Sequence, residues 1–137
     1  MHFSVAAGNG DKEVCMASPV RMSKGSDAAT VGNINVEDRC GPTSNFGPCV
    51  TLGGPGENIT STWIGSSSAT GVLPGTYMAF QHIAGLMVVL FVHDPSLRFD
   101  TTAMKKEPVG ISQTMAPDND GSNAGSIGII ANNEVLS

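Results

Sequence analysis

The stretch Gly75–Val92 reads GTYMAFQHIAGLMVVLFV, and the rest of the chain can be organised around it. Gly75 permits a tight entry and the Thr76 hydroxyl can cap a first turn, so a helix is expected to begin here. Nearly every position from Met78 onward is apolar or small, so no face of the helix is expected to contact water. We therefore predict a buried helix over about Thr76–Val92, in the middle of a domain.

Three short apolar segments predict the strands of a sheet around this helix, namely Phe3–Ala7, Asp27–Ile34 and Val50–Gly56. Their apolar residues are nearly continuous rather than alternating with polar ones, which is typical of parallel strands that are covered on both faces. The alternating segment Asn58–Gly65 predicts an edge ribbon. Together these patterns favour the α/β class.

The segments after the central helix are shorter and more polar. Residues 94–106 predict a short second helix that Pro108 ends. From about residue 110 to residue 137 the chain is rich in Gly, Asn and Ser, which predicts an irregular C-terminal arm. Around Ile127–Ala131 the alternatives are a terminal strand or packed arm and, equally, fraying. Residues 1–137 are thus expected to form one domain.

Composition argues against several classes of function. Charged residues make up 14% of the chain and the net charge is −5, so no nucleic-acid or anionic-membrane partner is expected. The apolar run Ile83–Val92 is ten residues long, whereas a membrane span needs about 20. Residues 1–8 lack the basic and long apolar regions of a secretion signal. The 17 glycines and eight prolines indicate short elements joined by turns, as in a loop-rich extracellular enzyme.

The central stretch resembles the nucleophile motif of subtilisin-like serine proteases (subtilases), Gly-Thr-Ser-Met-Ala-Thr-Pro-His-Val-Ala-Gly. The similar residues are Gly75, Thr76, Met78, Ala79, His82, Ala84 and Gly85. Tyr77 holds the position of the serine, and Phe80 and Gln81 replace the Thr-Pro pair. The resemblance implies the C-terminal part of a subtilisin-like three-layer fold, with a parallel sheet around the central helix and without the nucleophile.

Further motifs extend this resemblance from about Val5 to about Asn133, and they are most similar to the proteinase K and aqualysin branch. Residues 44–50, SNFGPCV, resemble the Ser-Asn-Tyr-Gly-Ser-Cys-Val segment of aqualysin-like enzymes. In that branch the cysteines corresponding to Cys15 and Cys49 are bonded, so the resemblance implies this disulfide. Without it, three buried free thiols are an equal alternative. The three cysteines form no Cys-x-x-Cys pair, which argues against zinc.

The segment Val5–Asn9, VAAGN, resembles the strand whose terminal asparagine completes the oxyanion hole. By this resemblance the Asn9 side-chain amide would donate a hydrogen bond to the oxyanion, a donor whose loss in subtilisin costs about 10²–10³ in kcat. The residues before it would line one wall of the P1 pocket, namely Ala6, Ala7 and Gly8. Taken alone, the Gly-Asn-Gly triplet indicates only a turn.

The rest of the catalytic triad is not found in the sequence. Subtilases order their triad Asp, His, Ser along the chain, and neither Asp-Ser/Thr-Gly nor His-Gly-Thr precedes Val5. His82 falls at the position of the structural histidine of the family and is expected to be a hydrogen-bonded core residue. His93 lies at the end of the predicted helix, where an imidazole can interact with the last backbone carbonyls of the helix and with the negative end of its dipole. The Tyr77 phenol, with an ordinary pKa of about 10, needs a base or a cation to become a nucleophile.

Thr51 stands where the family commonly has an aspartate that helps to bind calcium, so we expect no cofactor, no metal and no high-affinity calcium site. The resemblance implies a secreted family of endopeptidases that act on peptides and proteins. This chain is expected to be a truncated, catalytically inactive copy. The alternative is a non-catalytic module that binds peptides, a propeptide-like inhibitor or a protease. Because part of the fold would be missing, the chain is expected to expose apolar surface.

Overall fold

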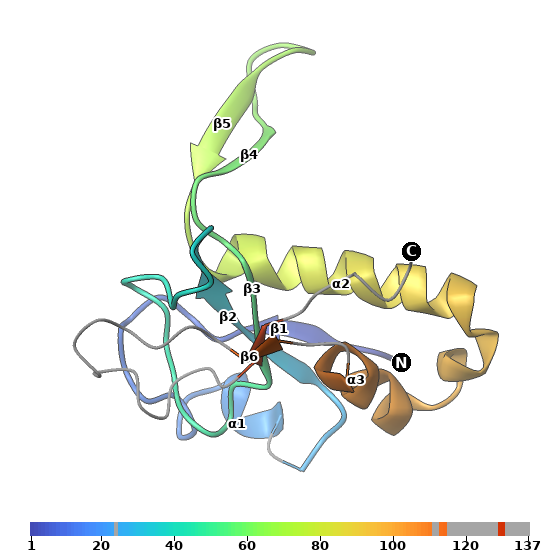
Figure 1. Ribbon diagram of the computed structural model, residues 1–137. Helices are drawn as coiled ribbons and strands as arrows, with labels where there is room; N and C mark the ends of the chain where they lie inside the picture. The colour runs from blue at the N-terminus through green and yellow to red at the C-terminus, as the bar shows by residue number, and fades with distance from the viewer. Residues whose placement is uncertain (24, 111–112, 115–128, 131–137) are drawn as a thin grey trace.

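The computed structural model describes residues 1–23, 25–110, 113–114 and 129–130. Its longest element is the helix α2 (Thr76–His93), which lies across one face of a sheet (Figure 1). The sheet has five strands in the order β1-β2-β3-β7-β6. The α/β class that the sequence indicates is confirmed.

Three parallel strands form the body of the sheet: β1 (Ser4–Ala6), β2 (Ala29–Ile34) and β3 (Leu52–Pro55). β2 pairs with β1 on one side and with β3 on the other. All six residues of β2 are buried, as the nearly continuous apolar pattern predicts for a strand covered on both faces. The three strands expected from the sequence are thus confirmed, each slightly shorter than its apolar segment.

Two short strands from the C-terminal part of the chain extend the sheet, β6 (Gln113–Thr114) and β7 (Ile129–Ile130). β7 runs parallel to β3 and pairs Ile130 with Gly53, and β6 runs antiparallel to β7. Of the two alternatives for this region, a terminal strand is therefore found. The rest of the predicted irregular arm lies outside the described residues.

A two-stranded antiparallel ribbon projects from the body of the molecule (Figure 1) and consists of β4 (Ile59–Thr62) and β5 (Thr70–Leu73). It confirms the predicted edge ribbon. The sequence did not indicate its second strand, because Thr70–Leu73 is too short to show an alternating pattern. The Trp63 ring packs over Gly71, where an added Cβ would lie 3.0 Å from the ring.

The helical segments that follow α2 differ from the expected single helix over residues 94–106. A 3-10 helix, η1 (Pro95–Arg98), is followed by α3 (Thr101–Gly110). The Asp94 carboxylate accepts the backbone N–H of Ser96 at 2.9 Å, which starts η1. Pro108 lies inside α3 and does not end it. A proline removes one N–H near the end of a helix, but its own φ is helical, so the chain can continue for a further turn.

The N-terminal end of α3 is held by Asp27, which precedes β2. Thr101 Oγ1 donates to Asp27 Oδ2 at 2.5 Å, and Thr102 Oγ1 donates to Asp27 Oδ1 at 2.9 Å. These hydrogen bonds, that from Thr101 first, lower the pKa of Asp27 below its ordinary value. They attach α3 to the sheet.

One stripe of α2 packs on the sheet, and its buried residues are Thr76, Ala79, Ile83, Met87 and Leu90. Their spacing of three or four residues places them on one side of the helix. The other side is exposed and includes Tyr77, Val88 and Val92. The expectation that no face of this helix meets water was therefore wrong, because the described residues cover α2 from the sheet side only.

By length and composition alone, α2 qualifies as a candidate membrane span, with 18 residues and a mean hydropathy of 1.4. The core helix of a globular protein gives the same signal. In this structure α2 packs against β1, β2 and β3, which is the packing of such a core helix. One candidate within the described residues is weak support for a membrane-spanning role.

A second apolar cluster, formed by Ala7, Val14, Val20, Cys49 and Val50, lies away from α2 and next to the short helix α1 (Val20–Ser23). The sequence did not indicate α1, because four residues are too few for a periodic pattern. A disulfide joins Cys15 to Cys49 within this cluster. The pairing implied by the family resemblance is thereby confirmed, and it connects the segment after β1 to the segment before β3.

Candidate functional site

The end of β1 and the first turn of α2 meet, although the residues involved are separated by 67 or 68 positions in the sequence. Gly8 N–H donates to Thr76 Oγ1 at 3.1 Å. Thr76 in turn donates twice to Asn9 Oδ1, from its backbone N–H at 2.9 Å and from its hydroxyl at 2.9 Å. The structure thus brings the predicted oxyanion residue Asn9 to the turn that carries Tyr77.

These hydrogen bonds determine which way the Asn9 amide points. Because Oδ1 accepts two donors from Thr76, Nδ2 lies on the other side of the amide, and Asn9 is exposed. Gly75 makes room for this amide: an added Cβ would lie 2.7 Å from Asn9 Nδ2, and the φ of 126° at Gly75 disfavours any side chain. The oxyanion role of Asn9 stays a prediction; the structure shows that its Oδ1 is held by Thr76 and that its Nδ2 lies next to Gly75.

Replacing Thr76 with valine is expected to lower the free energy of unfolding by about 1–3 kcal/mol. The Thr76 side chain is fully buried, and valine would leave the Gly8 N–H without its acceptor and remove one donor to Asn9. Urea denaturation followed by circular dichroism measures the change. Thr60→Val, at an exposed threonine of β4, is the matched control, and an equal loss in both variants would contradict the role given to Thr76.

A pocket of about 430 Å³ adjoins Asn9, and its walls contain the three residues of the predicted P1 wall, Ala6, Ala7 and Gly8. Tyr77 and Phe80 of α2 border the same pocket. Its walls are mainly apolar, and among the described residues that line it Lys12 is the one with a charge. The structure therefore gathers the predicted wall and the residue at the nucleophile position around one cavity.

Sequence reasoning missed the role of Asn45, whose buried amide supports this wall. Asn45 Nδ2 donates to the Ala7 carbonyl at 2.8 Å, and Asn45 Oδ1 accepts the N–H of Gly10 at 2.9 Å and that of Lys12 at 3.2 Å. These bonds hold the loop after β1 in place. The signal for Asn45 in the sequence is its place in the SNFGPCV motif at residues 44–50.

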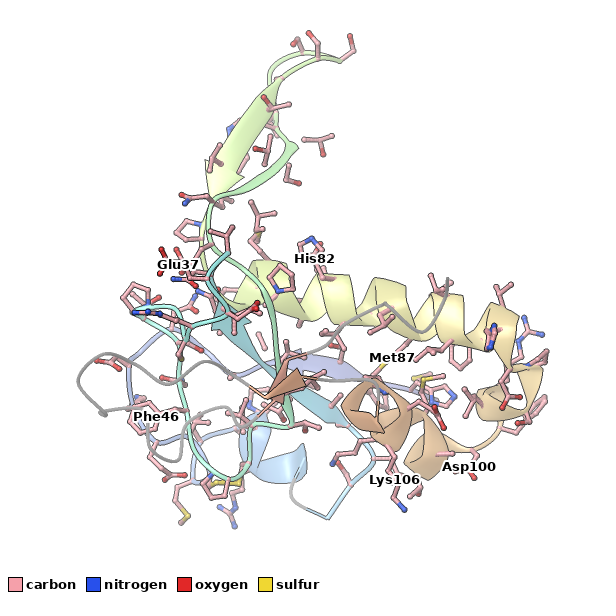
Figure 2. The ribbon with its side chains drawn as sticks, viewed as in Figure 1. Glu37, Phe46, His82, Met87, Asp100 and Lys106 are labelled. Carbon is pink, nitrogen blue, oxygen red and sulfur yellow. A yellow bond between two sulfur atoms is a disulfide. The ribbon has the colours of Figure 1, made fainter. Side chains whose placement is uncertain are left out.

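The three histidines of the chain lie at three different places along α2. His82 is exposed and points away from the sheet, whereas Met87 points toward it (Figure 2). The core position expected for His82 was therefore wrong, although its Nδ1 lies 3.0 Å from the Met78 carbonyl oxygen and is hydrogen-bonded to it. His93 is the last residue of α2, and the His2 ring packs on Phe91 with 4.9 Å between the ring centroids.

The Thr51 side chain does not fit the calcium-binding role that an aspartate has at this position in the family. Its Oγ1 accepts the backbone N–H of Thr30 at 3.1 Å, so this neutral oxygen already has a partner. Within the part of the chain that the structure describes, no group of three or more His, Cys, Asp and Glu side chains is placed to hold a metal ion. The expected absence of a cofactor stays a prediction.

A structural comparison defines the class of protein to which this fold and site belong. The fold is similar to that of a cold-adapted subtilisin-like serine proteinase, with a TM-score of 0.76 and 27% sequence identity. The match covers 91% of this chain and 42% of the proteinase. The fold is thus part of a subtilisin-like fold.

Sequence comparisons indicate the same class of protein as the structural comparison. The chain is 45% identical over 96 residues to the subtilisin-like serine protease pepC of Aspergillus niger and 42% identical over 106 residues to the subtilase-type proteinase psp3 of Schizosaccharomyces pombe. It is 45% identical over 96 residues to the subtilisin-like serine protease Rho m 2.0101 of Rhodotorula mucilaginosa. No family model matches the chain.

The chain belongs to the subtilisin-like serine protease family. The matches cover 70% of the chain for pepC, 77% for psp3 and 70% for Rho m 2.0101, and they span 17%, 23% and 27% of those proteins. The chain therefore corresponds to about a quarter or less of the length of these relatives.

Proposed function

We propose that this chain is a non-hydrolysing part of a subtilisin-like domain that binds peptides in the pocket between β1 and α2. One observation carries the proposal: the oriented amide of Asn9 lies beside a helix start that presents Tyr77 in place of a nucleophile. The groups that would hold a peptide carbonyl are kept, and the group that would attack it is replaced.

Peptide binding is supported by the donors and the walls around the pocket. A carbonyl oxygen placed next to Asn9 could accept a hydrogen bond from Nδ2 and would also meet the positive end of the α2 dipole. The neighbouring side chain of the peptide would enter the pocket along Ala6 to Gly8. Its apolar walls favour an apolar or amphipathic side chain.

The lack of hydrolysis follows from the positions of Tyr77 and of the imidazoles. His82 follows Tyr77 by five residues and so points about 140° away around the helix. His93 follows by sixteen residues, which is about 24 Å along the axis. His2 packs at the far end of α2, against Phe91. No imidazole of this chain is therefore placed to deprotonate the Tyr77 phenol.

The disulfide supports a proposal about the compartment. Disulfides persist in oxidising environments and are rare in the cytosol, and Cys15 is bonded to Cys49. We therefore propose that the chain works outside the cytosol, where secreted proteases, their propeptides and their substrates are available partners. The alternative function, a module that binds a protease or a propeptide, uses the same pocket and the same compartment.

The proposal predicts binding without turnover. The purified chain should release no p-nitroaniline from blocked tetrapeptide p-nitroanilides, and Tyr77→Ser alone should also be inactive because this chain supplies no base. Isothermal titration should detect binding of the same peptides. Ala6→Leu, which fills the pocket, should weaken binding on the order of tenfold, whereas Val36→Leu, at an exposed position elsewhere, should not. Hydrolysis that is lost on Tyr77→Ala would contradict the proposal.

A further inference from the structure

The triplet Asn58-Ile59-Thr60 has no part in the proposed function. It is an Asn-x-Thr sequence, the acceptor for N-linked glycosylation in proteins that pass through the secretory pathway. Such triplets also arise often by chance, so the position of Asn58 in the fold must show whether a glycan fits there.

Asn58 lies at the surface, on the turn between β3 and the projecting ribbon of β4 and β5 (Figure 1). Asn58 and Thr60 are both exposed, and Ile59 between them is half-buried. The φ of Asn58 is 55°, a left-handed conformation that asparagine tolerates in turns. A glycan attached at this turn would extend into solvent without displacing packed side chains.

The side-chain amide of Asn58 differs from those of the other asparagines that the structure describes. Four of these use the side chain in a hydrogen bond within the fold, namely Asn9, Asn33, Asn35 and Asn45. Within the described residues no hydrogen bond involves the Asn58 side chain. A glycan is joined to the side-chain nitrogen of asparagine, so Asn58 can be modified without loss of a contact that holds the fold.

The ribbon that follows Asn58 is exposed and uncharged. Residues 58–73 contain no Asp, Glu, Lys or Arg. Ile64 is 86% exposed and Val72 is 58% exposed, and neither of the two apolar clusters in the described part of the chain contains a ribbon residue. An isolated two-stranded ribbon has marginal stability, and exposed apolar strands associate readily. The ribbon is therefore a surface that benefits from a solubilising cover.

We propose that Asn58 carries an N-linked glycan that covers the ribbon β4–β5 and limits its association. The glycan would begin two residues before Thr60, whose cross-strand partner is Val72. Paired residues of an antiparallel ribbon point to the same face, so sugars that extend along Thr60 also cover Val72. Glycans are bulky and solubilising, and they supply the polar surface that the uncharged ribbon lacks.

The modification is a group transfer to the Asn58 amide. The bond between C1 of the first sugar and a phosphate oxygen of a lipid-linked pyrophosphate oligosaccharide breaks, and a bond between C1 and Nδ2 forms. Nδ2 loses one proton, and the lipid pyrophosphate leaves with the bonding electron pair. The Thr60 hydroxyl completes the acceptor sequence. The inference rests on the compartment proposed from the Cys15–Cys49 disulfide, since the donor and the transferase belong to the secretory pathway.

The test is expression of the full chain behind a heterologous secretion signal in yeast, with mass spectrometry of the chain recovered from whole cells. The unchanged chain should carry a glycan that peptide N-glycosidase F removes, which leaves an aspartate in place of the asparagine. Asn58→Gln and Thr60→Val should carry no glycan, and Thr60→Ser should keep it. Thr62→Val is the matched control and should also keep the glycan, because Thr62 is an exposed threonine of the same strand outside the triplet.

The cover over the ribbon is measured with the same two valine variants, Thr60→Val and Thr62→Val. Both add the same apolar group to β4, and they differ in the glycan. During incubation at equal concentration, Thr60→Val should lose monomer at least about twofold faster than Thr62→Val. Size-exclusion chromatography measures the remaining monomer.

Three results would overturn the proposal: an Asn58 that stays unmodified in the secretory pathway, a glycan that is retained in Thr60→Val, or an equal loss of monomer in the two valine variants. Because the added signal fixes the compartment, these results concern Asn58 and the ribbon alone. A failure to bind peptides would count against the proposed function and not against the glycan.

Discussion

Tyr77→Ser, co-expressed with a segment made of the part of the Rho m 2.0101 protease domain outside the region matched here, is expected to hydrolyse peptides at least about 10³-fold faster than the unchanged chain co-expressed with the same segment. In subtilisin the loss of the serine alone lowers kcat about 2 × 10⁶-fold, so even an imperfectly assembled site should show a large gain. The segment would supply the Asp and His that precede the serine in the subtilase triad order. Thr76 donates twice to Asn9 Oδ1 and so fixes the Asn9 amide, whose oxyanion role stays a prediction.

Three controls make this result specific. Tyr77→Ala co-expressed with the same segment should stay inactive, because it opens the site without adding a hydroxyl. Tyr77→Ser without the segment should also stay inactive. The segment with its triad histidine replaced by alanine should give no gain. The activity is measured as release of p-nitroaniline, and a complex of Tyr77→Ser that forms normally but shows no turnover would contradict the assignment of Tyr77 to the nucleophile position.

Removal of the Cys15–Cys49 disulfide, by Cys15→Ser together with Cys49→Ser, is expected to lower the free energy of unfolding by about 3–4 kcal/mol. The two cysteines are separated by 34 residues, and a loop of this length loses much of its freedom in the unfolded chain when it is closed. The bond also lies within the apolar cluster that contains Val14 and Val50. The second expected consequence is a less ordered pocket wall, since Val14 lines the pocket.

Urea denaturation followed by circular dichroism measures this change, under oxidising conditions and with the peptide affinity determined in parallel. Cys40→Ser is the matched control, because it alters a cysteine outside the disulfide. It should shift the unfolding midpoint by much less than the double substitution. Equal stability of the double variant and the unchanged chain would show that the packing of the cluster, and not the covalent link, holds these segments together.

Much of the fold could be predicted from local patterns. α2 begins at Thr76, as expected from the glycine and threonine before a long apolar run, and it ends one residue after the predicted Val92. β1, β2 and β3 coincide with the apolar segments, because buried parallel strands need nearly continuous apolar residues. The motifs around Asn9 and Tyr77 each have a recognisable order of residues, and the structure brings Asn9 to the first turn of α2, while the roles of both residues stay predictions.

Elements without a local pattern could not be predicted. The strands β5 and β7 are too short to show periodicity, and they exist because a neighbouring strand offers them hydrogen bonds. The role of Asn45 could not be predicted for a similar reason. Its amide bonds to Ala7 and Gly10, which are far from it in the sequence, so only the folded structure shows that it holds the loop after β1. Pro108 predicts the end of a helix, yet α3 continues past it to Gly110.

The sequence by itself determined the class of this protein and the course of its central helix, and it predicts that Tyr77 holds the position of the family's serine, because each of these depends on residues close together in the chain. Only the tertiary structure decided which side of that helix is covered. An apolar helix pattern shows that a partner surface is needed and does not show whether the same chain provides it. The sheet covers one side of α2, and the side with Gly85, Val88 and Val92 is left open. His82, expected in the core, is exposed for the same reason.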